Sequence, residues 1–509
     1  MSENSANNKR IAKNTFMLYM RQIIVMAVGF YSVRVVLSVL GVENYGIYNV
    51  VGGVVSMLSF LSGTMASATQ RFFSFYLGLN DSEKLKKVFS VNCVLYLLLL
   101  AVVFVALESG GLWFVKNHLE IPEGRESAVL FIYKFSVLTF LVSMISSPFV
   151  AAINAHEDMQ IFAYISIIEA LLKLSIVYML SWISFDKLEL YSILLFAATS
   201  LTTLIYIATS LIKYAECQIT KLYWDYSIFK EVMGYTGWTL FGQVTTTARM
   251  QGVTILINQY FTPITVASRA IASQITGQLN SFAGNFNRSL YPPIIKSYSS
   301  GRLREMYQLV YRGSKIAFFL MWVLSLPIWV YMDKILSIWL DVVPERAVLF
   351  TRLSLIEVLI QSISYSIMTA ARAPGKMRNY ELILGLMQFA FFGAVWYIVS
   401  LGYPDYSVYV AIIILNIAMF FVRLIIVRGL TGLPLRGFVL NVVLRMGGVV
   451  VGSLLPFIFM SQVVPYSFIS MLVVMVVGTL INCLMMYFIG LSGTERAAVL
   501  SMVLSKIKK

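Results

Sequence analysis

The arginines inside apolar segments are the residues of this sequence that most need a hydrogen-bonding or anionic partner. Arg249 lies deep within an apolar stretch, and Thr245, Thr246, Thr247 and Gln251 are its polar neighbours. An arginine at the centre of a membrane-spanning helix costs about 2.5–3.5 kcal/mol even on the lenient insertion scale. Its guanidinium should therefore face water or an anion, and its planar fork of N–H groups matches phosphate or diphosphate. Arg249 is the first candidate for binding an anionic cargo.

Four further arginines interrupt apolar stretches. Arg34 and Arg269 lie towards one end of their segments, whereas Arg71 and Arg288 lie towards the other. Long basic side chains near helix ends reach the membrane surface, so anchoring is an alternative explanation for Arg34, Arg71 and Arg288. Together with Arg249, these residues predict a cavity whose lining is basic overall.

Acidic residues inside the apolar segments are fewer. Glu169 and Lys173 stand at i and i+4, the spacing of a self-neutralising pair on one helix face, and Asp333 is followed directly by Lys334. Glu357 and Glu381 remain as candidates for ion coupling. We therefore predict that one of these two carboxyls couples transport to a proton or a sodium ion.

The sequence contains no recognisable catalytic or metal-binding motif. His118 and His156 are its only histidines, and "NAHEDMQ" around His156 is interpreted as a solvated turn. Cys93, Cys217 and Cys483 are scattered and are interpreted as small apolar residues. We therefore predict a protein that is not an enzyme and that holds no cofactor or metal.

Composition indicates what must position these residues. Of the 509 residues, 59% are hydrophobic and 12% charged, and the mean hydropathy is +0.80. Such a chain predicts an all-α, polytopic membrane protein, because helices satisfy their own backbone groups in lipid. About fourteen spans are predicted, near residues 14–40, 45–77, 88–107, 128–153, 160–184, 189–213, 231–261, 263–292, 314–340, 350–371, 379–400, 406–428, 438–460 and 467–490.

The loops between these spans alternate in charge. One set carries about 23 lysines and arginines, while the other carries about four, Lys116, Arg125, Lys187 and Arg346. The positive-inside rule therefore places both termini in the cytoplasm and requires an even number of spans. The net charge of +15 is explained by this topology, and nucleic-acid binding is not needed.

The loop near residues 213–231 divides the first twelve spans into two sets of six. We predict an N-terminal lobe at 1–213, a cytoplasmic connector at 214–230 and a C-terminal lobe at 231–428. A C-terminal helix pair with a basic tail occupies 429–509. Two parallel repeats of six helices would enclose a central cavity.

The chain also resembles a known family, the bacterial oligosaccharide flippases of the O-antigen and capsular polysaccharide type. They belong to the multidrug/oligosaccharidyl-lipid/polysaccharide exporter superfamily. The stretches that carry the resemblance are "VLGVENYGIYNVVGGVVSMLSFLSGTMASATQRFFSFYLG", "SSPFVAAINAHEDMQIFAYISIIEALLKL", "GYTGWTLFGQVTTTARMQGVTILINQYFTPITVASRAIASQI", "NFNRSLYPPIIKSYSSG" and "ILSIWLDVVP".

The resemblance implies a fourteen-helix transporter of the bacterial inner membrane that alternates between inward-open and outward-open states. Its cargo would be an undecaprenyl-diphosphate-linked oligosaccharide, moved to the outer leaflet for O-antigen or capsular polysaccharide assembly, with a polysaccharide polymerase as a further partner. By position in their spans, Arg34, Arg71, Arg249 and Arg269 would meet the diphosphate. A cation-coupled multidrug exporter of the same superfamily is the main alternative, and a membrane-embedded sugar or acyl transferase is a third.

Overall fold

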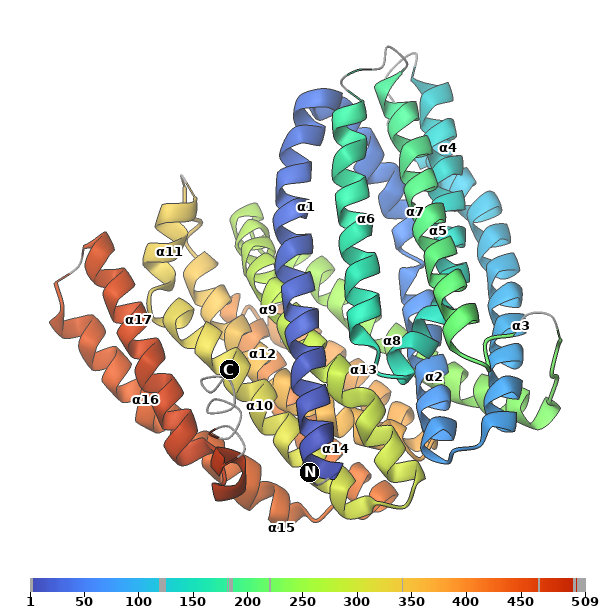
Figure 1. Ribbon diagram of the computed structural model, residues 1–509. Helices are drawn as coiled ribbons and strands as arrows, with labels where there is room; N and C mark the ends of the chain where they lie inside the picture. Colours follow the sequence, from blue (N-terminus) through green and yellow to red (C-terminus); the bar gives the residue numbers. More distant parts are fainter. Residues whose placement is uncertain are drawn as a thin grey trace. The chain divides into compact units, whose positions relative to one another are not determined.

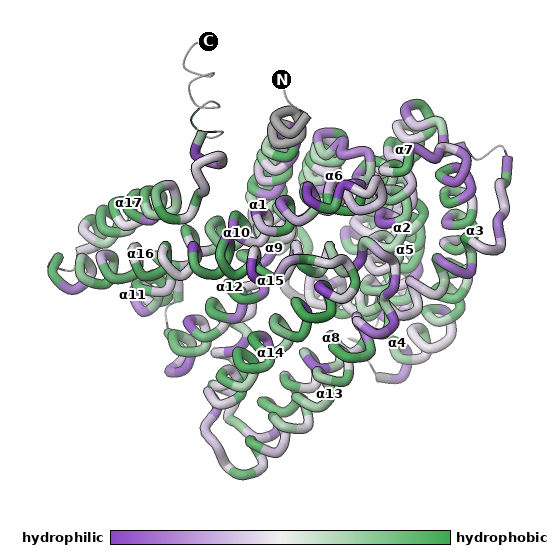
Figure 2. The backbone as a smooth tube through the Cα atoms, turned by 90° about the horizontal axis from the view of Figure 1, so that it is seen from below, coloured by the Kyte–Doolittle hydropathy of each residue, from purple (hydrophilic) through white to green (hydrophobic). Residues whose placement is uncertain are grey.

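The computed structural model describes residues 3–118, 125–180, 182, 186–218, 221–340, 342–465, 467–497 and 500. These residues form helices joined by short turns, with no strand among them, so the all-α prediction is confirmed. Figure 2 shows hydrophobic residues running along helices such as α14, α16 and α17. The helix lengths and the apolar outer surfaces identify a multi-pass membrane protein.

In the first half of the chain, the described residues before the long connecting segment form seven α-helices, labelled in Figure 1. A short π-helical turn, Leu107–Gly111, joins the third helix to the fourth. The bounds are α1 Glu3–Ser56, α2 Ser59–Gly78, α3 Ser82–Ala106, α4 Leu112–His118, α5 Glu126–Ala155, α6 Met159–Met179 and α7 Lys187–Lys213.

The second half begins with two long helices and ends with a helical hairpin. Two further π-helical turns, Val439–Val443 and Met486–Gly490, lie in this hairpin. The bounds are α8 Tyr226–Tyr260, α9 Pro263–Ser299, α10 Leu303–Val330, α11 Met332–Trp339, α12 Ala347–Arg372, α13 Arg378–Ser400, α14 Tyr406–Thr431, α15 Leu435–Phe438, α16 Leu444–Val463 and α17 Phe468–Met485.

Glycine divides α1 into two separate segments. Gly41 has φ +78° and ψ 165°, which interrupts the helical backbone, and the chain turns back after it (Figure 1). The first segment, Arg10–Gly41, is long and apolar enough for one span; the second, Asn44–Ser56, is bent by 47° from α2 and is long and apolar enough only together with it. The break agrees with the predicted gap between residues 40 and 45.

Eleven described helical segments are long and apolar enough to cross a membrane, and the bent pair raises the number to twelve. The two remaining predicted spans correspond to α8 and α9. These helices are 35 and 37 residues long, which is ample, but they are too polar to meet the same criterion. The predicted total of fourteen therefore depends on these two helices.

The described chain divides into two compact units: the first is Arg10–Leu240, and the second consists of the residues up to Lys9 and those from Phe241 onward. In the first unit α5 is central and contacts α2, α3, α6 and α7. In the second unit α12 is central and contacts α9, α10 and α14. Each central helix is the fourth span of its half when α8 and α9 are counted. The lobe boundaries at 213/214, 230/231 and 428/429 stay predictions, and residues 501–509 of the basic tail lie outside the described residues.

Candidate functional site

Polar side chains from four helices of the second unit converge on one cavity. It has a volume of about 200 Å³ and lies among α8, α9, α12 and α14. Its charged residues are Arg249, Arg269 and Glu357, and Asn280 and Gln361 add amide groups. The cavity thus brings together two of the predicted cargo-binding arginines and one of the predicted coupling acids.

The guanidinium of Arg249 is held in place by a neighbouring helix. Arg249 is only 9% exposed, and its Nε donates a hydrogen bond to Gln388 Oε1 on α13 at 3.2 Å. Gln388 Nε2 in turn donates to the Thr246 hydroxyl at 3.0 Å. Thr246 also donates to the carbonyl of Gly242, one turn back in α8. This chain of hydrogen bonds orients the fork of Arg249 beside the cavity.

Glu357 lines the same cavity as the two cations. Its carboxylate interacts electrostatically with Arg249 and Arg269, and its Oε1 accepts a hydrogen bond from Asn416 Nδ2 at 3.3 Å. The guanidinium carbon of Arg269 lies 5.8 Å from the centre of the Tyr409 ring, a cation–π distance. The lining thus holds two guanidinium groups and one carboxylate, which leaves it with an excess of positive charge.

Two other predicted residues of this unit lie away from that cavity. Glu381 lies in the first turn of α13, and its carboxylate contacts the backbone of α8 at Gly242 so closely that a Cβ there would overlap it. Arg288 lies roughly 28 Å further along α9 than Arg269, at ~1.5 Å per residue. Neither lines the described cavity.

The remaining predicted arginines belong to the first unit. Arg71 is only 1% exposed, and its guanidinium carbon lies 4.7 Å and 4.6 Å from the ring centres of Phe72 and Phe75. Its Nη1 lies 3.6 Å from Glu231 Oε1. These contacts fit an arginine that holds helices together. Arg34 is exposed on α1.

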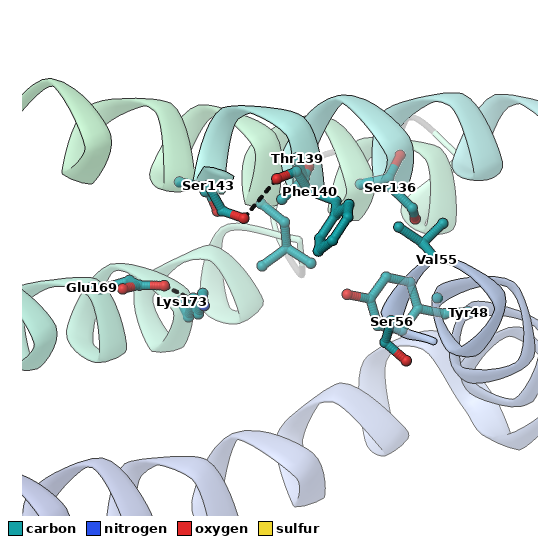
Figure 3. Close-up of a pocket in the computed structure, with 13 residues that line it drawn as sticks. Tyr48, Val55, Ser56, Ser136, Thr139, Phe140, Ser143, Glu169 and Lys173 are labelled. Atoms are coloured by element: carbon teal, nitrogen blue, oxygen red, sulfur yellow. Dashed lines mark hydrogen bonds and ion pairs between the residues drawn. The ribbon is translucent and has the colours of Figure 1, made fainter. Parts of the chain in front are cut away.

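The first unit has a polar cavity of its own, shown in Figure 3. It measures about 270 Å³ and is lined from α1, α5, α6 and α7. The predicted pair is confirmed, because Lys173 Nζ donates to Glu169 Oε1 at 2.6 Å. The hydroxyl groups beside this pair were not predicted from the sequence. Their signal was present, since Ser136, Thr139 and Ser143 recur on one helical face of α5.

The solvated-turn interpretation of "NAHEDMQ" is wrong. The Glu157 side chain is fully buried and pairs with Arg10 Nε at 2.7 Å. His156 stacks on Tyr214, with ring centres 4.2 Å apart, and its Nε2 lies 2.5 Å from Glu216 Oε1. Burial, and then the adjacent Asp158 carboxylate, raise the pKa of the Tyr214 phenol. The turn is a packed junction of the ends of α5, α6 and α7, and no group of three potential metal ligands occurs in the described residues.

No protein-family model and no curated protein sequence matches this chain. The fold, however, is that of the MATE transporters. A Vibrio cholerae MATE transporter, VcmN in its bent form, superposes with a TM-score of 0.63 at 16% identity, covering 86% of this chain and 99% of that one. An outward-facing multidrug resistance MATE family transporter of the MOP superfamily gives 0.69 at 15% identity, covering 82% and 95%. The MATE transporter ClbM in complex with Rb⁺ gives 0.68 at 15% identity, covering 85% and 96%.

Proposed function

We propose that this chain is an ion-coupled membrane transporter, and that Glu357 is the group through which the ion acts. The supporting observation is that Glu357 lines one cavity of about 200 Å³ with Arg249 and Arg269 and interacts electrostatically with both. Protonation of the carboxylate would remove its electrostatic attraction for both guanidinium groups, and deprotonation would restore that attraction. Binding of a single ion at Glu357 therefore changes whether the arginines interact with Glu357 or with another anion. Coupling of ion binding to transport requires such a change.

The first candidate cargo is a small organic molecule exported in exchange for a cation. The support is the fold, because the similar solved structures include a multidrug resistance transporter and a transporter in complex with Rb⁺. In this proposal a proton or sodium ion binds at Glu357 in one conformational state of the protein, and the cargo binds in another. Charge on Glu357, rather than on the arginines, then determines the transport rate.

The second candidate cargo is a lipid-linked oligosaccharide with a diphosphate. It is favoured by one specific observation, the excess of guanidinium groups over carboxylates around Arg249. A bidentate guanidinium recognises phosphate oxygens with a geometry that an ammonium group lacks. In this proposal Arg249 contacts the diphosphate, and the chain serves polysaccharide assembly as a flippase.

The coupling step can be tested in liposomes that contain the purified protein and an imposed proton or sodium gradient. Efflux of ethidium and flipping of a polyprenyl-diphosphate-linked sugar are measured in parallel. Glu357→Gln should abolish the dependence on the gradient, whereas Glu305→Gln, in the first turn of α10 and outside that cavity, should not. If Glu357→Gln, Glu381→Gln and the double variant all keep that dependence, ion coupling at these acids is refuted.

The cargo can be assigned with Arg249 variants in the same liposomes. If the cargo carries a diphosphate, Arg249→Ala should abolish its flipping and Arg249→Lys should restore only part of it, because lysine lacks the fork. Arg304→Ala, an exposed residue of α10, is the control. Normal flipping per folded molecule in Arg249→Ala would exclude the diphosphate contact and leave the small-molecule exporter.

A further inference from the structure

The C-terminal hairpin packs on α10, because α10 contacts both α16 and α17. At this junction Gly490 is so close to its neighbours that a Cβ on it would overlap the ring of Phe319 and lie 3.2 Å from Val449 Cγ2. Lys315 lies one helical turn before Phe319 on α10. Arg445 lies one helical turn before Val449 on α16. The two cations therefore lie at the same end of the junction.

Positive charge exceeds negative charge at this end of the hairpin. Glu495 is the only carboxylate side chain in the sequence after Asp405. It already accepts from Lys315 Nζ at 2.6 Å, and Arg312 Nε lies 3.5 Å from its other oxygen. Arg312 and Arg445 both act on Lys315 as like charges. The junction thus holds three cations and one carboxylate.

Arg445 is the cation of this group that no carboxylate neutralises. It is partly buried, and among the residues that the structure describes it has no hydrogen-bond or ion-pair partner. Its fork of N–H groups is therefore open to an acceptor. Arg496 adds a further guanidinium beside Glu495, and its Nε donates to the Leu491 carbonyl at 3.2 Å. The junction requires an anion that the described chain does not supply.

The surface beside Arg445 is apolar, and it lies near the membrane boundary. Leu440 and Leu444 precede Arg445 on the same side of the hairpin, and both are exposed, as is Phe488. The last apolar segment ends at Gly490, and the cations lie about one helical turn, roughly 5 Å, beyond the level of that residue. An anion at Arg445 would therefore lie level with the lipid head groups, with exposed hydrocarbon beside it.

We propose that this junction binds an anionic phospholipid, with its phosphate on the guanidinium of Arg445. The phosphate oxygens accept from the fork, and Lys315 adds electrostatic attraction. The acyl chains lie on Leu440 and Leu444. A zwitterionic head group is disfavoured, because its ammonium would add to the excess of positive charge. The lipid is retained and not transported, so this inference does not rest on the cargo or the coupling proposed above.

The test uses the full chain, delipidated in a neutral detergent, with dioleoyl phosphatidylglycerol as the probe. The melting temperature should rise more with this lipid than with dioleoyl phosphatidylcholine at equal concentration, because a ligand of the folded state stabilises it. Native mass spectrometry gives the dissociation constants. Arg445→Gln should weaken phosphatidylglycerol about fivefold, the usual effect of one cation near a lipid surface. Arg304→Gln, at an exposed position roughly 16 Å from Lys315 along α10, should leave its dissociation constant unchanged.

The same variant separates lipid binding from a structural role of Arg445. Without lipid, Arg445 only repels Lys315, so Arg445→Gln should melt at the wild-type temperature or above it. A lower melting temperature would mean that Arg445 holds helices together, and it would overturn the proposal. Arg496→Gln provides a second route if Arg445→Gln cannot be purified, and it should weaken phosphatidylglycerol by a similar factor.

Three further results would overturn the lipid assignment. The first is phosphatidylcholine that binds as tightly as phosphatidylglycerol. The second is a wild-type dissociation constant for phosphatidylglycerol in both arginine variants. The third is inorganic phosphate that alone raises the melting temperature as much as phosphatidylglycerol does, because the junction would then bind a free anion.

Discussion

At the residue scale, one ion pair joins the chain beyond α17 to α10. Lys315 Nζ lies 2.6 Å from Glu495 Oε2, and the two side chains are only 4% and 11% exposed. Arg312 Nε lies 3.5 Å from the other carboxylate oxygen. The backbone N–H of Ser492 also donates to Glu495, at 2.7 Å. Glu495 is therefore fully engaged, and each partner depends on it.

Removal of one partner of this buried pair should strongly destabilise the protein. Lys315→Met leaves the Glu495 carboxylate without its closest cation, which typically costs about 3–5 kcal/mol when a buried pair is broken. Lys86→Met is the control, because Lys86 pairs with a Glu83 side chain that is 72% exposed and should contribute less than about 1 kcal/mol. Thermal unfolding in detergent measures both. Equal melting temperatures for the two variants would contradict the prediction.

The same carboxylate should make stability depend on acid pH. Burial raises the pKa of Glu495, but the hydrogen bonds from Lys315 and from the Ser492 backbone outweigh it and hold the pKa below its ordinary 4.5. The stabilisation is therefore complete above that ordinary value and is lost as the pH falls through the lowered one. The melting temperature of the wild type should fall more steeply below about pH 4.5 than that of Glu495→Gln. Parallel curves would show that Glu495 does not titrate with folding.

Residue-level partners could be predicted only where they are close in sequence. The Glu169–Lys173 pair follows from a separation of four residues on one helix. The partners of Arg249 and Glu357 are Gln388 and Asn416, which lie 139 and 59 residues away. Their meeting depends on how the helices pack, and a single sequence does not contain that information in any local pattern.

At the element scale, the hairpin of α16 and α17 depends on a close approach of the two helices. Gly478 of α17 faces the ring of Phe457, a residue of α16 that is 1% exposed, and a Cβ at Gly478 would overlap that ring. Nothing lies within 4 Å of the corresponding point at Gly447 of α16. Gly478 therefore leaves no room for a side chain, whereas Gly447 of the same hairpin does.

Gly478→Ala should destabilise the hairpin by about 1–3 kcal/mol, the usual cost of inserting a methyl group into a well-packed contact. Gly447→Ala should be neutral or slightly stabilising, because alanine favours the helix and meets no neighbour. Melting temperatures of the two variants in detergent decide the matter. A Gly478→Ala protein as stable as Gly447→Ala would show that the ring of Phe457 can move aside without cost.

The elements themselves were largely predictable, because continuous apolar runs between charged loops determine where spanning helices lie. The gap predicted after residue 40 corresponds to the backbone break at Gly41. The π-helical turns were not predicted, since one extra residue in a helical turn leaves no mark on hydropathy. The burial of "NAHEDMQ" was missed for a related reason. Its partners, Arg10 and Glu216, come from distant helix ends.

At the scale of the whole molecule, the topology depends on whether α8 and α9 both cross the membrane. Both are long enough, yet their polarity keeps them out of the set of clearly apolar spans. That polarity is expected if their faces line a wet cavity, as Arg249 and Arg269 do. The charge of the loops requires an even number of spans, which either twelve or fourteen satisfies, so loop charge alone does not decide.

The accessibility of the turn between α8 and α9 decides whether these two helices cross the membrane. In a protein whose three cysteines are replaced, we predict that an impermeant maleimide labels Thr262→Cys and Tyr403→Cys from outside intact cells. Lys221→Cys and Arg304→Cys should react only after the membrane is opened; all four positions are exposed in the structure. If α8 and α9 instead lie on the cytoplasmic side as a hairpin, Thr262→Cys should behave like Lys221→Cys. That result would reduce the spans to twelve, and it would remove the intramembrane cost that makes Arg249 a candidate for binding an anion.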